Sequence, residues 1–499
     1  MKDLQESRKQ IDEIDQQLLE LFQKRMQIVG EVAEYKKENH LSSNDPSREK
    51  AMLERNLEKV EEKWQPYYRD FQENMFRISK KYQKTLLAEN EPLLKDSTDY
   101  STYIDNAFLA SQKAKADLLI YPEETVNATV GTLYGRDNTI AAFDTVYQCY
   151  NSVSNKRKAS YAGGIQGNAD FNEAAFQWVN RLNNIHLAHK VIATPGGTGA
   201  ISLAVTNCLN PNETLLIPSI AWGSYRVMAA QNALKVDTYE ILADGEVSVE
   251  DIKKKSTEIM AAQKKLLVII NDPCQNPTGI TLGKEKWQDL IDYLKELSAQ
   301  GPIVILNDIA YFDYARDYAH ATEYMETFNG ISENMAVIIA FSCSKSLTAY
   351  GMRLGASILL TKEEEKAQHI YNSFIRTARA SWSNVNNGFM DCFVDLMKNH
   401  QEEYLKEKDH ALEDLNRRSE LFIQQAQECG LDVYPYSEGF FVTCNVPKEK
   451  VNAFNEALTE HHIYGVKFSN GIRIAVCGLS YEKVDGLAFR MKEILSSLG

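Results

Sequence analysis

The sequence predicts a multidomain protein, with an all-α head of three helices followed by an α/β body built on a parallel sheet. Two observations lead to this fold class. Up to about residue 87 the apolar residues recur with helical spacing. From about residue 106 onward, short apolar runs rich in β-branched residues alternate with amphipathic stretches, as in sheets covered by helices. The length of 499 residues is also too great for one ordinary domain.

The first helix is expected over residues 4–38, which contain no Pro and one Gly. Apolar residues stand at positions 4, 11, 14, 18, 21, 28, 29 and 32. At a rise of about 1.5 Å per residue such a helix is about 50 Å long, which exceeds the width of a small domain. We therefore expect this helix to pack against a second copy of the chain.

Two further helices complete the head. Asp45 as N-cap and Pro46 at the first helical position start a second helix that is expected to run towards Gln65. Pro66 opens a third helix, which is expected to end near Leu87. The head thus spans residues 1–88, and the polar stretch 89–105 is expected to be a linker.

The first helix carries two cations inside its apolar stripe. Arg25 and Lys36 are eleven residues apart, so they lie within about 20° of each other on a helical wheel. Because burying cations is costly without an anion, the stripe predicts a pocket for an anionic ligand. Arg8 lies about 100° from Arg25 and is expected to serve the pocket of another chain. Ser79 and Gln83, four residues apart, share one face of the third helix.

The head resembles the all-helical chorismate mutases over its whole length. The residues at the active-site positions of that family are Arg8, Arg25, Lys36, Asp45, Arg48, Glu49, Ser79 and Gln83. The resemblance implies that Arg25 and Arg48, with Arg8 from a partner chain, clamp the carboxylates of chorismate. It also implies that Lys36 and Gln83 donate to the ether oxygen as it gains charge, while Glu49 holds the ring hydroxyl. The alternative is a coiled-coil dimerisation module with solvated Arg and Lys.

The body places polar residues just after predicted strands. Apolar runs are found at 214–217, 266–270, 303–306 and 337–341. Asn276, Asp308 and Lys345 each follow one of the last three runs. Open α/β sheets bind their ligands at the carboxyl ends of their strands, so these side chains are expected to share one site.

The residue types at this site point to pyridoxal phosphate. Lys345, in Ser342-Cys343-Ser344-Lys345, is placed to join the cofactor covalently. The pyridine nitrogen needs a carboxylate, for which Asp308 is the natural candidate. Asn276 and Tyr311 can donate to the phenolic oxygen, and Trp222 can stack on the ring.

A phosphate site is expected beside these residues. Gly196, Gly197 and Thr198 precede a helix-like stretch and offer backbone N–H groups at its start. Arg353, with Ser342, supplies a fixed cation.

From residue 106 to 499 the chain resembles the aspartate and aromatic aminotransferases of fold type I. The resemblance implies a large parallel-sheet domain over about 150–380, and a smaller α+β domain from the N-terminal arm and about 381–499. Lys345 would also act as general acid and base. The resemblance assigns substrate contacts to Gly131, Trp222, Asn276, Arg379 and Arg473. Arg473 would hold the α-carboxylate in a bidentate pair, and Arg379 would reach a dicarboxylic side chain in the other subunit. Both halves then predict a homodimer or a larger even oligomer.

Fusion of the two modules suggests consecutive or nearby steps of phenylalanine and tyrosine synthesis. Our first interpretation is chorismate rearrangement together with transamination of phenylpyruvate and 4-hydroxyphenylpyruvate, with glutamate or aspartate as the donor. The alternatives are transamination of prephenate itself to arogenate, or an aspartate aminotransferase with a non-catalytic head that oligomerises or senses. A DNA-binding regulator is disfavoured because the head has no net positive charge.

Composition excludes several other classes. The net charge of −14 argues against a nucleic-acid partner. Eight cysteines without paired spacing and the lack of an apolar signal segment favour a cytoplasmic protein, and no apolar run reaches membrane-spanning length. No metal site is expected, because the pairs His186/His189 and His461/His462 lack partner ligands.

Overall fold

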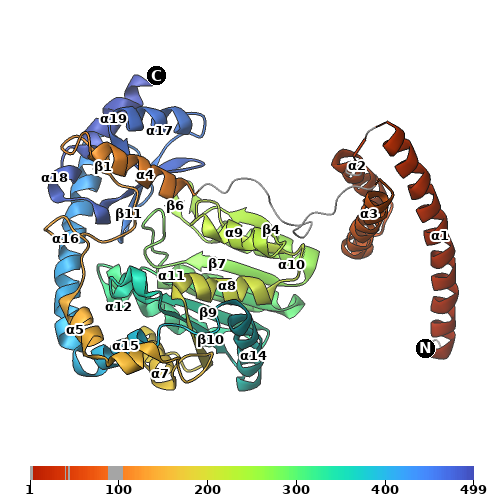
Figure 1. The fold of residues 1–499 in the computed structure, drawn as a ribbon, viewed down its shortest axis with the longest axis horizontal. Coiled ribbons are helices and arrows are strands. Elements are labelled where there is room, and N and C mark those ends of the chain that lie inside the picture. Colours follow the sequence, from red (N-terminus) through yellow and green to blue (C-terminus); the bar gives the residue numbers. More distant parts are fainter. Residues whose placement is uncertain (1–3, 40, 43–44, 88–104) are drawn as a thin grey trace. The chain divides into compact units, whose positions relative to one another are not determined.

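The computed structural model describes residues 4–39, 41–42, 45–87 and 105–499. The chain divides into two compact units, residues 1–100 and 101–499, which are described separately (Figure 1). The predicted linker 89–105 lies outside the described residues except for Asp105. Asp105 caps the first helix of the second unit by accepting hydrogen bonds from the backbone N–H groups of Ala107 and Phe108.

The head contains the three expected helices. They are α1 (Leu4–Glu38), α2 (Pro46–Leu57) and α3 (Gln65–Leu87), with a short 3₁₀ turn at Glu62–Trp64. Asp45 caps α2 by accepting a hydrogen bond from the Arg48 N–H, as predicted. The expectation that α2 runs towards Gln65 is wrong, because α2 ends eight residues earlier. The Gln65 side chain donates to the carbonyls of Leu57 (3.0 Å) and Val60 (3.1 Å), so it satisfies carbonyls that a longer helix would have used.

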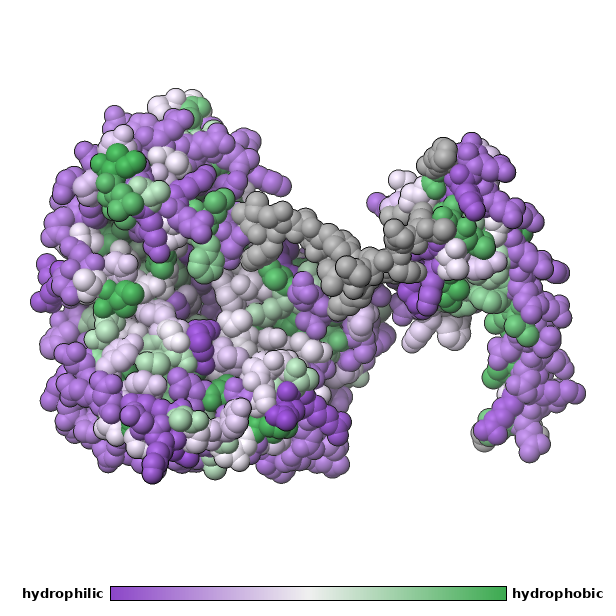
Figure 2. Space-filling view, viewed as in Figure 1, coloured by the Kyte–Doolittle hydropathy of each residue, from purple (hydrophilic) through white to green (hydrophobic). Residues whose placement is uncertain are grey.

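Most of α1 is not covered by the rest of its own unit. Only Val29 and Ala33 are buried, in the part where Gly30 lies against Tyr82 and Leu86 of α3. The exposed apolar side chains of α1 include Leu4, Ile11, Ile14, Leu18, Leu19, Leu21, Phe22 and Ile28. Figure 2 shows apolar side chains at the surface along this helix. The head by itself therefore leaves an apolar face of α1 uncovered.

The body is built on a seven-stranded sheet with the order β2-β10-β9-β8-β7-β3-β4. The strands are β2 (Ala188–Thr194), β3 (Thr214–Pro218), β4 (Lys235–Tyr239), β7 (Leu266–Asn271), β8 (Ile303–Asp308), β9 (Met335–Ser342) and β10 (Gly355–Thr361). The four strands expected from apolar runs are confirmed. The sheet is mixed rather than purely parallel, because β10 runs antiparallel to both β9 and β2. The chain between β9 and β10 holds only short helical turns, so it lacks the covering helix that a parallel crossover usually contains.

Both faces of the sheet are buried, which explains its near-continuous apolar strands. On β3, Leu215 and Ile217 face one core while Leu216 faces the other, as the two-residue period of a strand requires. The first core is closed by α8 (Gly196–Cys208), α9 (Ser224–Gln231) and α14 (Glu364–Ser381). The second is closed by α5 (Asp144–Ser152), α7 (Ala169–Asn180), α10 (Glu250–Gln263), α11 (Lys284–Leu297) and α15 (Asn387–Asn399).

A third core surrounds a small antiparallel sheet in the order β11-β14-β13. Its elements are β11 (Phe441–Asn445), β13 (Val466–Phe468), β14 (Gly471–Ala475), α17 (Val451–Glu460), α18 (Tyr481–Val484) and α19 (Leu487–Ser497). The N-terminal arm of the body, which is the segment 105–143 before α5, adds two elements. These are α4 (Asn106–Leu118) and β1 (Val126–Asn127), and β1 pairs with β12 (Ile463–Tyr464). The long helix α16 (Gln401–Cys429) places Tyr404 in the second core and Phe422 in the third, so it joins the two. The predicted domain limits near residues 150 and 380 stay predictions.

The remaining elements are short. They are α6 (Asn155–Ala159), α12 (Tyr318–Thr322), α13 (Cys343–Ser346), β5 (Leu242–Ala243), β6 (Glu246–Val247) and 3₁₀ turns at Ser298–Gln300, Phe312–Tyr314, Glu323–Gly330, Tyr350–Met352 and Val476–Gly478. None of the helices in the described part of the chain combines the length and apolar character that a membrane span requires.

Candidate active sites

A cavity of about 480 Å³ lies at the carboxyl ends of β7, β8 and β9. The register places Asn271 beside Asp308 and Asp308 beside Ala340, so the ends of the three strands lie at one edge. The predicted site residues that line this cavity are Gly131, Gly197, Thr198, Trp222, Asn276, Asp308, Tyr311, Ser342, Lys345, Arg353 and Arg473. Residues from the sheet, the arm and β14 are thus brought together as predicted.

Lys345 is held in this cavity by α13, which begins directly after β9. Its Nζ donates to the carbonyl of Gly131 at 2.6 Å and lies 4.8 Å from the ring centre of Tyr350 and 5.3 Å from that of Tyr311. Removal from water, aided by the positive charges of Arg473 and Arg353, lowers the pKa of Lys345 to about 8. About a tenth of this amine is therefore neutral, and nucleophilic, at pH 7, and about half is neutral at pH 8.

Asp308 is the buried last residue of β8. Its Oδ2 accepts from the Tyr225 hydroxyl at 2.6 Å and its Oδ1 from the Ala310 N–H at 3.1 Å. Burial raises the pKa of Asp308 to about 6, while these two hydrogen bonds oppose the rise. A nearby cation would stabilise the ionised form of this buried carboxylate. The sequence analysis missed Tyr225, whose position three residues after Trp222 does not reveal that α9 directs its hydroxyl at the β8 end.

Arg473 lies in β14 with its guanidinium buried in the cavity wall. Its Nη1 donates to Asn276 Oδ1 at 3.0 Å and its Nη2 to the Thr129 carbonyl at 2.7 Å. The group stacks over Phe441, 4.3 Å from the ring centre. Its Nε–H is buried and has no hydrogen-bond partner among the described residues. Because a buried donor without a partner is costly, Arg473 is prepared to bind an anion.

The start of α8 forms a cradle next to Arg353. Gly196 has a positive φ of 73°, and a Cβ there would come within 2.8 Å of Arg353 Nη2. Gly197 closely approaches Ser342, because a Cβ there would be 3.2 Å from that side chain. Arg353 Nη1 donates to Ser344 Oγ at 3.1 Å, so the hydroxyl that steadies this guanidinium is Ser344 rather than Ser342. Backbone N–H groups at a helix start, together with a fixed arginine, fit a phosphate group.

Arg379 lies apart from this cavity. It belongs to the last turn of α14, is exposed, and donates to the Ser383 hydroxyl. Its proposed action in the cavity of another subunit stays a prediction.

The head contains a cavity of about 420 Å³ between α1, α2 and α3. Of the predicted residues, Arg25, Lys36, Asp45, Arg48, Glu49, Ser79 and Gln83 line it. Two further lysines, Lys24 and Lys80, raise the basic lining residues to five against two acidic ones, so the cavity suits an anion. Arg8 does not line it, since Arg8 stands 17 residues before Arg25, about 26 Å along a straight helix.

The contacts in the head cavity hold its polar groups in place. Arg25 donates to Ser79 Oγ, and burial lowers the pKa of Arg25. Lys80 Nζ pairs with Glu49 Oε2 at 3.1 Å, a contact that the sequence analysis missed. Gln83 Oε1 is buried without a hydrogen-bond partner in the described part of the chain. This amide oxygen can therefore accept a hydrogen bond from a donor group of a bound ligand.

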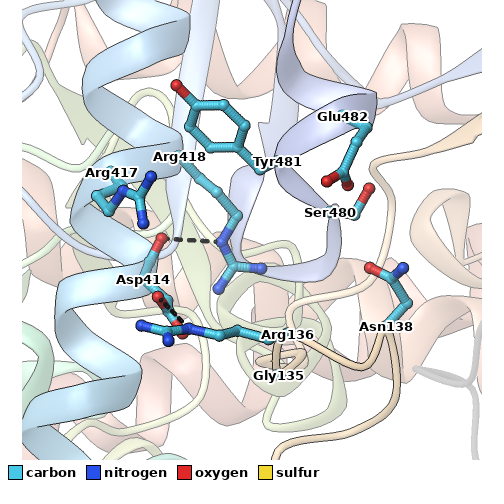
Figure 3. Close-up of a pocket in the computed structure, with 9 residues that line it drawn as sticks. All are labelled: Gly135, Arg136, Asn138, Asp414, Arg417, Arg418, Ser480, Tyr481 and Glu482. Carbon is cyan, nitrogen blue, oxygen red and sulfur yellow. Dashed lines mark hydrogen bonds and ion pairs between the residues drawn. The ribbon is translucent and has the colours of Figure 1, made fainter.

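A third cavity, of about 280 Å³, lies between the arm, α16 and α18 (Figure 3). Two of the three arginines that line it, Arg136 and Arg418, are bound to protein groups. Arg136 pairs with Asp414 at 2.8 Å, and the buried Arg418 donates to four backbone carbonyls. These contacts tie the chain before α5 and the segment before α18 to α16.

Comparisons with known proteins match the body and the head to two separate families. Residues 123–491 match the family described as aminotransferase class I and II, and residues 7–84 match the family described as chorismate mutase type II. The aspartate aminotransferase of Salmonella typhi is 25% identical over 312 residues, 60% of this chain and 75% of that protein. The aromatic-amino-acid aminotransferase of Pseudomonas aeruginosa is 28% identical over 194 residues, 38% of this chain and 46% of that protein. A crystal structure of an aminotransferase from Anaerococcus prevotii superimposes with a TM-score of 0.77 at 28% identity, covering 81% of this chain and 99% of that one.

Proposed function

Because the chain belongs to the class I and II aminotransferases and carries a type II chorismate mutase domain, we propose that it rearranges chorismate to prephenate and transaminates aromatic keto acids. The observation that supports this proposal is the presence on one chain of two cavities, each with an unsatisfied buried polar group. In the body this group is the Arg473 Nε–H, and in the head it is Gln83 Oε1.

In the body, pyridoxal phosphate supplies an electron sink for the negative charge that develops at the substrate Cα. We propose that Asp308 keeps the pyridine nitrogen cationic and that Tyr311 and Asn276 contact the phenolic oxygen. Gly196, Gly197, Thr198, Ser342 and Arg353 hold the phosphate, and Trp222 stacks on the ring. Arg473 binds the substrate α-carboxylate through its free Nε–H and an Nη group. The Lys345 amine, in the same cavity, moves the proton from Cα.

The uptake of pyridoxal phosphate is expected to follow the titration of Lys345. The neutral amine is the reactive form, and a lowered pKa makes that form available at lower pH. With a pKa of about 8, the uptake rate should rise about fivefold from pH 7 to 8 and less than about twofold from pH 8 to 9. Stopped-flow absorbance on cofactor-depleted protein measures this rate, with Lys254→Ala, on the exposed face of α10, as the control. A rise of about tenfold per pH unit up to pH 9 would show that an ordinary lysine is responsible.

In the head, we propose that catalysis is electrostatic, since chorismate rearranges without a covalent enzyme intermediate. Arg25 and Arg48, with Arg8 of another subunit, hold the two carboxylates in a compact conformer. Lys36 and Gln83 donate to the ether oxygen, and Glu49, positioned by Lys80, holds the ring hydroxyl. Asp45 fixes the start of α2, and Ser79 fixes Arg25.

For the body we propose phenylpyruvate and 4-hydroxyphenylpyruvate as keto acids, and glutamate or aspartate as the donor, with Arg379 of the other subunit serving the dicarboxylate. Aromatic side chains in the cavity, Trp222, Tyr311, Tyr350 and Phe441, support an aromatic substrate. The curated aromatic-amino-acid relative supports the same choice. One observation favours prephenate as a second candidate, because Lys115 of α4 also lines the cavity and can pair with an extra carboxylate.

A stopped-flow panel separates these candidates. The protein is converted to its amino form with glutamate, and the return of its absorbance is followed with prephenate, 4-hydroxyphenylpyruvate, phenylpyruvate and oxaloacetate. The proposal expects rapid return with both aromatic keto acids. Return with prephenate alone would assign the body to arogenate formation, and return with oxaloacetate alone would make it an aspartate aminotransferase.

We further propose a homodimer or a larger even oligomer in the cytoplasm. The exposed apolar side chains of α1 and the distance of Arg8 from its own cavity support assembly. The eight free cysteines support a reducing compartment. A monomer in light scattering would overturn the assembly, and periplasmic fractionation of the native protein would overturn the location.

A further inference from the structure

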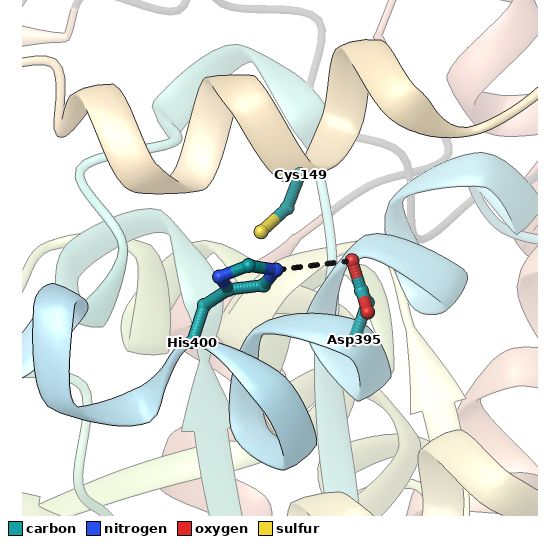
Figure 4. Close-up of side chains that lie close together, drawn as sticks. All are labelled: Cys149, Asp395 and His400. Carbon is teal, nitrogen blue, oxygen red and sulfur yellow. Dashed lines mark ion pairs between the residues drawn. The ribbon is translucent and has the colours of Figure 1, made fainter.

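Three side chains with metal-binding atoms converge outside the cavities described above (Figure 4). Cys149 comes from α5, Asp395 from α15, and His400 from the junction between α15 and α16. The thiol sulfur, a carboxylate oxygen and an imidazole nitrogen all lie within 4.8 Å of one another. Cys149 and His400 are distant in the sequence, so only the fold brings these side chains together.

Each of the three side chains directs one potential ligand atom towards the other two. Asp395 Oδ1 accepts from the Asn399 side chain at 2.7 Å, which leaves Oδ2 directed towards His400. The distance from Asp395 Oδ2 to His400 Nε2 is 4.0 Å. Cys149 is only 4% exposed, while the side chains of Asp395 and His400 are 36% and 46% exposed. The sulfur of the cluster is thus buried in the protein, while the carboxylate and the imidazole are accessible to water.

We propose that Cys149, Asp395 and His400 bind a zinc ion. Thiolate, imidazole and carboxylate are the three ligand types that Zn²⁺ takes in proteins. In a tetrahedral zinc site these ligand atoms lie about 3.4 to 3.6 Å apart, so small side-chain rotations from the present positions complete the geometry. The Cys149 thiol loses its proton to solvent as the Zn–S bond forms, and a water molecule takes the fourth position.

The placement indicates a structural role for this ion. His400 immediately precedes α16, the helix that joins the second and third cores. About two turns of helix further on, Glu407 accepts hydrogen bonds from Thr145 of α5, so α5 and α16 are already in contact there. A zinc ion adds a second tie between the same two helices and fixes the first residues of α16 to the second core.

The bond to zinc is tested on the full-length holoenzyme, purified without a polyhistidine tag and stripped with a chelator. Titration with Co²⁺ is expected to give the strong visible absorption of a tetrahedral site, at longer wavelengths than the cofactor absorbs, saturating at one ion per chain. Added Zn²⁺ should abolish this absorption. His400→Asn and Cys149→Ser are each expected to weaken metal binding at least about tenfold.

His369→Asn is the matched control, because His369 also pairs with a carboxylate, Glu365, at 3.8 Å. The His369→Asn protein should bind the metal ion as tightly as the wild-type protein does. His400→Asn replaces a half-exposed side chain, and unchanged transamination confirms that it folds. Absence of the visible cobalt absorption in the wild-type protein would overturn the proposal, and so would absorption that survives in both cluster variants. Either result would leave the trio as a close contact of three polar side chains.

Discussion

Replacement of Lys345 with Ala is expected to reduce transamination by at least about 10³-fold, because one side chain both anchors the cofactor and moves the Cα proton. The variant should still consume chorismate at the wild-type rate, since every described residue that lines the head cavity belongs to the head. The two rates are measured on the same preparation of full-length protein, one by keto acid formation and the other by loss of chorismate absorbance.

Lys254→Ala is the control for the Lys345 experiment. Lys254 is an exposed lysine of α10, so its removal should leave both rates unchanged. A Lys345→Ala protein that retains more than about a tenth of the wild-type transamination would show that another group moves the proton.

Replacement of Arg25 with Ala is expected to lower kcat/KM for chorismate by about 10²- to 10³-fold. Arg25 is partly buried in the head cavity, where removal from water lowers its pKa and increases its gain from an anionic ligand. Transamination by this variant should equal that of the wild type. Loss of the guanidinium leaves Ser79 without its partner, but the hydroxyl still donates to the Met75 carbonyl, so the helix packing is retained.

Arg69→Ala, an exposed position of α3, serves as the control for Arg25. Wild-type chorismate consumption in Arg25→Ala would contradict the proposed site. A full-length protein without any chorismate consumption would instead favour the non-catalytic head that oligomerises or senses.

Sequence periodicity predicted much of the head. The eleven-residue spacing of Arg25 and Lys36 placed both on one face of α1, and both line the cavity. The end of α2 was not predictable in this way, because it depends on contacts of the Gln65 side chain with carbonyls formed only after the chain has turned. The Lys80–Glu49 pair depends on the packing of α2 against α3, which periodicity does not give.

In the body, the strand ends predicted the cavity because the carboxyl ends of adjacent parallel strands coincide. This rule correctly grouped Asn276, Asp308 and Lys345. The rule does not predict contacts between residues that are distant in the sequence. The Tyr225–Asp308 hydrogen bond and the reversed direction of β10 both follow from how helices and loops return to the sheet. The proximity of Cys149, Asp395 and His400 could not be predicted for the same reason, since these residues share no short motif.

The most direct test of the central claim is reduction of the holoenzyme with borohydride, followed by peptide mapping with mass spectrometry. We expect a phosphopyridoxyl group on the peptide that contains Lys345, in proportion to the cofactor bound, and on no other lysine. An unmodified Lys345 in protein that has retained pyridoxal phosphate would contradict the account.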